Sequence, residues 1–256
     1  MADVRVGVFH WHQPDEHAES KLDHLEEAFE SRDDPAGALV VLLEAFNLQV
    51  PYWPLEDWLE GFIADPASVA YDEAEYIGTL RDLSRRFQVW IVAGFLRVEG
   101  RRIENQALLF EPDDGAPAVL HTKLEVEDCD WMKPGEALLP DNPRPIRIAD
   151  QGFDLGCLIC LDLNTRWDQR LLAERPDLVV VPAANRRMRL VNNGRVDDQQ
   201  ALTDVPVAFA NQTIEGQART LGTCFSFLSD DTGRLLFPQG DNFPPEPFLH
   251  LEELSL

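Results

Sequence analysis

Basic residues are scarce in this 256-residue chain, where 22 Lys and Arg stand against 46 Asp and Glu and give a formal net charge of −24. Proteins bind the phosphate backbone of nucleic acids through Lys and Arg that displace counterions, so we expect no nucleic acid partner. No apolar run approaches the ~20 residues that a membrane-spanning helix needs, so we expect no membrane partner. The acidic excess fits both adaptation to salt and a solubilising surface.

Cysteine is also rare, and four residues are too few for a disulfide framework. The N-terminus lacks the basic leader and the long apolar stretch of a secretory signal, so we expect a cytoplasmic protein with reduced cysteines. Only three of the basic residues are lysines, and a lysine in an apolar setting therefore stands out. The apolar fraction of 45% and the charged fraction of 27% are typical of a globular protein that folds in water.

The chain shows no internal repeat and no low-complexity block, so residues 1–256 are predicted to form a single domain. Apolar residues at helical spacing predict helices over 19–30, 72–87, 166–175 and 199–211. Continuous apolar runs predict buried strands over 38–46, 89–96 and 177–184, and turn residues predict hairpins that join 102–112 to 117–124 and 145–150 to 153–163. This order favours an α/β fold, a four-layer α-β-β-α sandwich of two mixed sheets covered by helices. Residues 238–256, rich in proline at their start, are predicted to form a C-terminal arm.

Three polar residues lie in or at the ends of apolar strands: Glu44 in VVLLEAF, Lys123 in VLHTKLE and Cys160 in GCLICLD. An unpaired charge taken out of water costs several kcal/mol or more, so such groups are either paired or functional. Taken singly, Glu44 and Lys123 fit a structural ion pair and Cys160 a small core residue. Taken together they supply a nucleophile, a cation that stabilises its thiolate and a carboxylate that carries its proton.

The order of these segments resembles the nitrilase superfamily of carbon–nitrogen hydrolases over nearly the whole chain. VRVGVF resembles the opening strand of that family, and ALVVLLEAF the segment that ends in its catalytic glutamate. WIVAGFLR with NQALLFEPDDG resembles the central hairpin, HTKLEVE the lysine segment and LGCLICLDL the nucleophile strand. DLVVVPAA and SFLSDDTGRLL resemble the closing strands.

The resemblance implies a catalytic triad of Glu44, Lys123 and Cys160. Glu44 acts as general base, and the Cys160 thiolate attacks an amide carbonyl or nitrile carbon. The Lys123 ammonium and the N–H of Leu161 hold the charge that develops on oxygen. A thioester forms and is hydrolysed to a carboxylic acid, with no metal or organic cofactor.

Family members also carry a second acid after the lysine, and Glu125, Glu127 and Asp128 all fit that position. We favour Glu127, and a solvated acidic loop is the alternative. The residue after the cysteine is usually aromatic in the family and is Leu161 here, while Asn164-Thr165-Arg166-Trp167 replaces an arginine–aromatic–proline continuation. These departures bear on the substrate more than on the reaction, because pocket walls and loops determine specificity.

Four residues are candidates for substrate binding. Leu161 follows the nucleophile, and Trp53 and Trp167 are candidate pocket walls, although aromatic residues near prolines also serve as plain packing. Arg186 belongs to a basic cluster after DLVVVPAA and fits either a bidentate contact with a substrate carboxylate or a surface cluster paired with the acidic excess.

Two other patterns point to metal or redox chemistry. Cys157 and Cys160 form a C-x-x-C, but residues three apart in a strand point to opposite faces and no second pair follows at metal spacing, so Cys157 is predicted to be core. His10 and His12 share one face of a strand without an evident third ligand, so no metal site is expected.

The sequence therefore predicts a cysteine-dependent hydrolase that acts on a small linear amide or carbamoyl compound, with amides preferred to nitriles. Two alternatives stay open: transfer of the acyl group to an amine, and a catalytically silent binding or scaffold protein that kept the fold. The expected partner is a small-molecule amide or nitrile, and the resemblance implies a homodimer or higher homo-oligomer.

Overall fold

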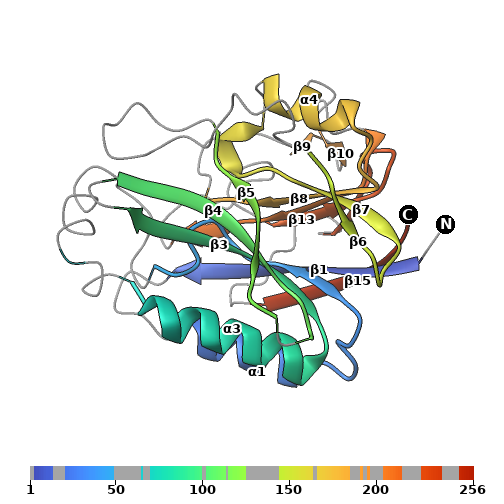
Figure 1. Cartoon of the computed structure of the whole chain (residues 1–256). Helices are drawn as coiled ribbons and strands as arrows, with labels where there is room; N and C mark the ends of the chain where they lie inside the picture. The colour runs from blue at the N-terminus through green and yellow to red at the C-terminus, as the bar shows by residue number, and fades with distance from the viewer. Residues whose placement is uncertain are drawn as a thin grey trace.

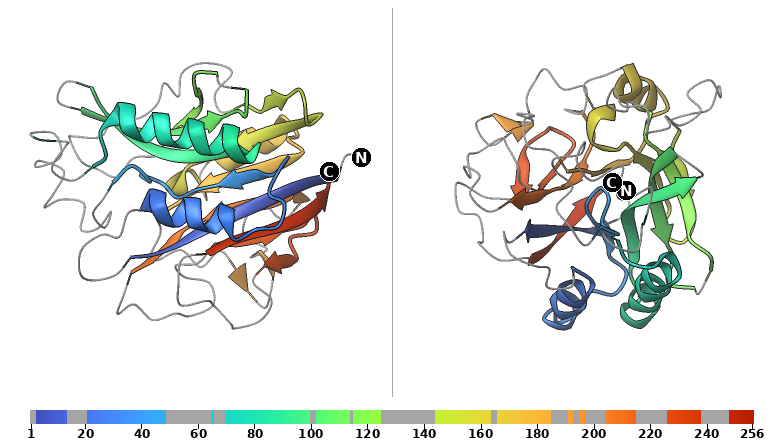
Figure 2. Two further views of the ribbon diagram at one scale, coloured as in Figure 1. Left: turned by 90° about the horizontal axis from the view of Figure 1, so that it is seen from below. Right: turned by 90° about the vertical axis from the view of Figure 1, so that its left-hand side faces the viewer.

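The computed structural model describes residues 3–13, 21–48, 65, 70–99, 102–113, 115–124, 144–163, 166–184, 191–192, 195–196, 204–214, 226–237 and 248–256. Two mixed β-sheets lie back to back between helices (Figure 1). Helices α1 (Lys21–Glu30) and α3 (Glu73–Phe87) cover the first sheet, and α4 (Arg166–Ala173) lies over the second (Figure 2). The predicted four-layer α-β-β-α sandwich is confirmed. Among the described helices, none is long and apolar enough to cross a membrane.

The first sheet contains seven of the described strands and is mixed, with both parallel and antiparallel pairs. In spatial order they are β12 (Gln212–Ile214), β1 (Asp3–Gln13), β2 (Leu39–Val41), β3 (Trp90–Glu99), β4 (Arg102–Phe110) and β5 (Ala118–Thr122), with β15 (Phe248–Ser255) also paired to β1. β2 is buried throughout because neighbouring strands flank it and other layers cover both of its faces.

The second sheet contains six of the described strands, and a separate two-stranded ladder lies outside both sheets. In spatial order the six are β14 (Leu235–Phe237), β13 (Phe227–Ser229), β11 (Val207–Ala210), β8 (Leu178–Pro182), β7 (Phe153–Cys157) and β6 (Ile146–Ile148), and the ladder is β9 (Val191–Asn192) with β10 (Arg195–Val196). Soon after β7 the chain forms a 3₁₀ turn, η2 (Cys160–Asp162), which begins at the predicted nucleophile.

Helix α3 forms where the spacing of apolar residues predicts it. Asp72 caps its first turn by accepting from the N–H groups of Ala74 and Glu75, at 3.0 and 3.1 Å. Tyr76, Leu80 and Leu83 recur at helical spacing and are buried against the first sheet. The helix therefore places Tyr76 beside β3, close to the turn that follows β2.

The helix predicted over 199–211 is wrong where the structure describes that segment. Residues 207–210 form β11, which pairs in parallel with β8 and antiparallel with β13. All four residues are buried, so the alternation that marks a strand is absent and helical spacing fits the same apolar residues. After Asn211 the same chain enters the first sheet as β12, so one continuous segment joins the two sheets.

The described part of the predicted C-terminal arm is a strand. β15 runs antiparallel to β1 from Phe248, opposite His10, to Ser255, opposite Asp3. This pairing brings the described ends of the chain side by side, as Figures 1 and 2 show. Residues 238–247 of the arm lie outside the described part, and the single-domain assignment stays a prediction.

Candidate active site

Glu44 lies in a tight turn just beyond the carboxyl end of β2. Leu42 N–H donates to Val92 O at 2.7 Å, and Phe46 N–H donates to Gly94 O at 3.0 Å, so the turn stays fastened to β3. A Cβ atom at Gly94 would lie 2.6 Å from Cα of Glu44, which no side chain tolerates. Glycine in β3 therefore allows the close approach that holds Glu44 in place.

Two side chains anchor the same turn. The side chain of Asn47 bonds the backbone of β3 as a neighbouring strand would. Its Nδ2 donates to Leu96 O and its Oδ1 accepts from Leu96 N–H, both at 2.9 Å. The Tyr76 hydroxyl donates to Gly94 O at 2.9 Å and ties α3 to the point where β3 meets the turn. Glu44 is thus held by backbone and side-chain bonds on both sides of its position.

Lys123 and Glu44 form a buried ion pair. Lys123 Nζ lies 2.5 Å from Glu44 Oε1, and the two side chains are 3% and 0% exposed. Lys123 directly follows β5, where its N–H donates to Asn105 O at 2.8 Å and extends the ladder with β4. The ion pair predicted from the apolar settings of these two residues is therefore present.

Cys160 meets this pair from the second sheet. It opens the turn η2 with a φ of +44°, a left-handed conformation that is strained for any residue with a Cβ. The Leu163 N–H closes the turn on Cys160 O at 3.1 Å. The Cys160 side chain shares a hydrogen bond with the Glu44 carboxylate, so the three predicted triad residues converge.

The surroundings of Cys160 favour the protonated thiol and raise its pKa above the ordinary value. Burial raises its pKa most, and the charge of Glu44 and the hydrogen bond to it raise the pKa further. Lys123 and the N–H of Ala184 lower the pKa but are outweighed. The resemblance assigns to Glu44 the role of the base that takes this proton as the sulfur attacks.

Two groups that the sequence analysis missed also bind Glu44. Asn105 Nδ2 donates to Oε1 at 2.6 Å, and the backbone N–H of Ala184, just beyond β8, donates to Oε2 at 3.0 Å. Both carboxylate oxygens are thus oriented by fixed donors from different sheets. Asn105 lies in β4 within the NQALLFE phrase, and its polar side chain in an otherwise apolar strand was the available signal.

A second buried pair links the lysine segment to the nucleophile turn. Asp162 Oδ2 lies 2.7 Å from His121 Nε2 and accepts from Ile159 N–H at 3.2 Å, while Oδ1 accepts from Leu124 N–H at 3.0 Å. His121 lies two residues before Lys123, and Asp162 lies two residues after Cys160. Buried Asp and His in apolar phrases were a signal that sequence analysis passed over.

The remaining predicted site residues are only partly placed. Leu161 lies within η2, directly after Cys160, and Trp167 lies in the first turn of α4. Glu127, Trp53 and Arg186 lie outside the described residues, as do Glu125 and Asp128, the other two candidates for the second acid. Their roles stay predictions.

Neither alternative pattern gathers metal ligands in the described part of the chain. Cys157 and Cys160 are both buried free thiols, and the sulfur of Cys157 contacts Leu158 O at 3.9 Å. His10 is buried where the two sheets join, and its Nδ1 lies 3.0 Å from the Ser226 hydroxyl. Within the described residues, no three His, Cys, Asp or Glu side chains are grouped to hold a metal ion.

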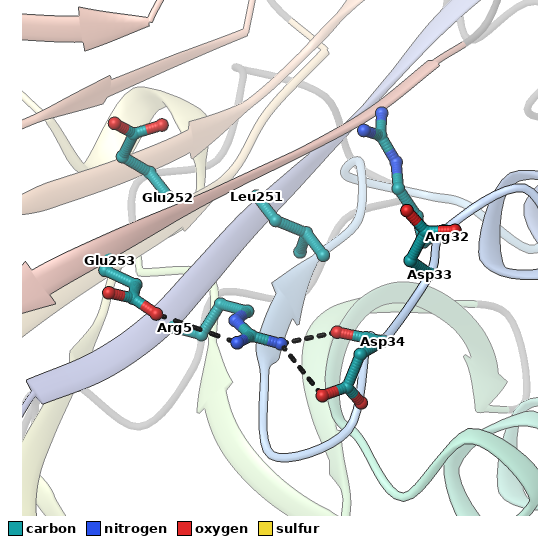
Figure 3. Close-up of a pocket in the computed structure, with 7 residues that line it drawn as sticks. All are labelled: Arg5, Arg32, Asp33, Asp34, Leu251, Glu252 and Glu253. Carbon is teal, nitrogen blue, oxygen red and sulfur yellow. Dashed lines mark hydrogen bonds and ion pairs between the residues drawn. The ribbon is translucent and has the colours of Figure 1, made fainter.

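A separate surface hollow, drawn in Figure 3, lies near the start of β1 and the end of β15. It is about 380 Å³ in volume and is lined by charged residues from β1, β15 and the turn after α1. Arg5 lies near the start of β1 and pairs there with Glu253 at 3.6 Å and with Asp34 at 3.9 Å. None of the residues that line this hollow belongs to the buried cluster of Glu44, Lys123 and Cys160, which is the candidate active site.

Comparison with known proteins identifies this fold. No protein-family model and no curated protein matches the chain. Solved structures do match: the chain has the fold of amidases of the nitrilase superfamily, which confirms the resemblance at the level of fold.

Two of these neighbours illustrate the likeness. A double mutant of the amidase from Nesterenkonia sp. AN1, in complex with acrylamide, has a TM-score of 0.69 and 19% identity over 98% of this chain and 90% of its own. A carbon–nitrogen hydrolase from Helicobacter pylori G27 has a TM-score of 0.64 and 18% identity over 99% of this chain and 89% of its own. Another mutant of the Nesterenkonia amidase was solved with butyramide, and a further one carries acrylamide added to its active-site cysteine.

Proposed function

We propose that this chain is a nitrilase-superfamily enzyme that hydrolyses the carbon–nitrogen bond of a small linear amide or carbamoyl compound. The observation that carries the proposal is the convergence of Glu44, Lys123 and Cys160, buried and bonded to one another, in a fold shared with cysteine-dependent amidases. Amides are favoured over nitriles because the neighbouring amidase was solved with acrylamide and with butyramide.

The reaction begins with a protonated thiol. As the sulfur of Cys160 attacks the carbonyl carbon, Glu44 takes the thiol proton. The charge that develops on the carbonyl oxygen is held by the Lys123 ammonium and the N–H of Leu161, and one such donor is typically worth about 3–4 kcal/mol. Glu44 then gives its proton to the nitrogen, the carbon–nitrogen bond breaks, and ammonia or an amine leaves a thioester on Cys160.

Water completes the cycle. Glu44 takes a proton from water as the oxygen adds to the thioester carbon, the carbon–sulfur bond breaks, and the thiol regains the proton. One amide and one water thus give one carboxylic acid and one amine. The donors from Asn105 and Ala184 keep the carboxylate of Glu44 aimed at the sulfur through both half-reactions.

The test is hydrolysis of a panel that includes propionamide, butyramide and acrylamide, with intact-protein mass spectrometry to detect an acyl adduct. Wild-type protein is expected to release ammonia, and Cys160→Ala is expected to lose this activity entirely. Cys157→Ala is the matched control, because that buried thiol lies three residues away in β7 and contacts Leu158 O instead of the carboxylate. Hydrolysis that persists in Cys160→Ala would refute the nucleophile, and binding without turnover in the wild type would favour the silent-protein alternative.

A further inference from the structure

Among the described residues that bond Glu44, Asn105 has a buried side-chain amide of which only the nitrogen is hydrogen-bonded. The residue is 1% exposed, and its Nδ2 donates to Glu44 Oε1 at 2.6 Å. Its Oδ1 is buried and has no hydrogen-bond partner among the described residues. Buried carbonyl oxygens in native proteins are nearly always bonded, so a vacant acceptor next to a general base needs an explanation.

Three of the surrounding donors bond the carboxylate. Lys123 Nζ and the N–H of Ala184 both donate to Glu44, as does the nitrogen of Asn105 itself. None of these donors bonds Asn105 Oδ1, so this acceptor is open to a molecule that enters the site.

The proposed reaction, on which this inference rests, brings such a donor to that point. The nitrogen of the scissile bond is attached to the carbon that Cys160 attacks, and it must reach Glu44 to take the proton. Because Asn105 Nδ2 touches the same carboxylate, a nitrogen bonded to Glu44 lies next to the amide group of Asn105. An unsubstituted carboxamide nitrogen still has an N–H to spare for Oδ1 in this position.

We propose that Asn105 is a substrate-contact residue whose Oδ1 accepts an N–H of the leaving nitrogen, and that the site therefore favours substrates whose scissile nitrogen carries a hydrogen. A nitrile nitrogen and an ester oxygen carry no hydrogen and leave Oδ1 unbonded. Sites built to bond an N–H discriminate strongly against analogues that lack it, because their own polar groups are then left unpaired.

The test compares butyramide with methyl butyrate, which share an acyl group and give the same thioester. For each substrate kcat/KM reports the steps up to loss of the leaving group. The ratio of the two kcat/KM values therefore reports the effect of the leaving nitrogen against that of the leaving oxygen. Asn105→Leu is expected to lower kcat/KM for butyramide about 10- to 100-fold more than for methyl butyrate. Gln106→Leu removes an amide from the same strand, where it bonds Glu104 at 3.0 Å, and should leave the ratio of the two substrates unchanged.

Equal losses for both substrates would mean that Asn105 acts only by orienting Glu44, and would overturn this inference while leaving the proposed function intact. Failure of the wild type to cleave either substrate would instead count against the proposed function.

A binding measurement avoids dependence on the folding of Asn105→Leu. Cys160→Ala is expected to bind butyramide at least about tenfold more tightly than 2-pentanone, in which a methyl group replaces the NH₂. Equal affinity for the two would also overturn the role of Asn105.

Discussion

The buried side chain of Lys21 makes the free energy of unfolding of this protein depend on pH. Lys21 opens α1 and is 3% exposed, and its Nζ lies 5.8 Å from the centre of the Phe46 ring. Burial lowers the pKa of Lys21 from 10.5 to about 7. The neutral amine is therefore favoured in the folded protein, and the ammonium is favoured in the unfolded chain.

This shift has a definite sign for stability. Between pH 7 and 10.5 the unfolded chain holds the proton and the folded protein does not, so the Lys21 contribution to the free energy of unfolding rises with pH. Below pH 7 both states are protonated and the full cost of the buried charge is present. Lys21→Met removes this cost, and we expect it to raise the free energy of unfolding by roughly 2–5 kcal/mol at about pH 6 and by little near pH 10.

Urea unfolding of both proteins from about pH 6 to about pH 10 measures this difference. Arg234→Met is the control, because it removes a positive charge from an exposed position and its effect should not change over this range. A Lys21→Met effect that is equally large at both ends of the range would contradict the lowered pKa.

Residue-level patterns in the sequence singled out three residues that the structure places in contact. Glu44, Lys123 and Cys160 stand out because each interrupts an apolar phrase, and the structure brings their side chains together. Asn105 and Asp162 were missed because their importance lies in partners 61 and 38 residues away, Glu44 and Leu124. No local spacing encodes such contacts, since the pairing of strands creates them.

At the level of elements, the candidate catalytic residues lie in short segments at strand ends. Glu44 lies in the turn after β2, Lys123 directly after β5 and Cys160 in η2 after β7. The strands themselves were predictable from apolar runs, as in β3 and β8, whereas β11 was not. The left-handed φ values of Ala45 and Cys160, 52° and 44°, were also beyond sequence patterns, because neither residue type favours that conformation.

Asp162 holds two of these elements together, the segment after β5 and the turn η2. Asp162→Asn keeps the shape but replaces one accepting oxygen by an NH₂ group, which then faces the N–H of either Leu124 or Ile159. We expect a loss of about 2–3 kcal/mol in the free energy of unfolding, because a buried, charge-assisted network is broken. We also expect kcat for butyramide to fall at least about tenfold, since Lys123 and Cys160 lose their relative placement.

Urea unfolding and amide hydrolysis check the two parts of this prediction. Asp154→Asn in β7 is a matched control, because Asp154 is 43% exposed and pairs with Arg147 on the surface at 3.3 Å. That variant should change the free energy of unfolding by no more than about 0.5 kcal/mol. If Asp162→Asn behaves like Asp154→Asn, Asp162 does not hold the two elements.

The whole molecule forms the site by closing one sheet against the other. Glu44, Asn105 and Lys123 come from the first sheet, and Cys160 and Ala184 come from the second. The backbone also runs directly from the second sheet into the first, from β11 through Asn211 to β12. At that point Asn211 N–H donates to the Ser226 hydroxyl at 2.9 Å, so a buried polar contact fixes the crossing.

Closing the sandwich also concentrates charge, and this makes stability depend on salt. The net charge of −24 opposes the compact state through repulsion, which salt screens with a Debye length of about 10 Å at 0.1 M and about 3 Å at 1 M. Salt also weakens favourable surface pairs such as Arg86 with Glu26, but exposed pairs contribute only about 0–1 kcal/mol each. Because the repulsion among acidic residues outweighs these pairs, we expect the Tm to rise by roughly 2–8 °C between about 0.05 and 1 M NaCl.

Differential scanning fluorimetry measures the shift, and choline chloride at equal ionic strength should reproduce it if screening is the cause. A Tm that falls with salt would show that the surface ion pairs stabilise the fold more than the acidic repulsion destabilises it.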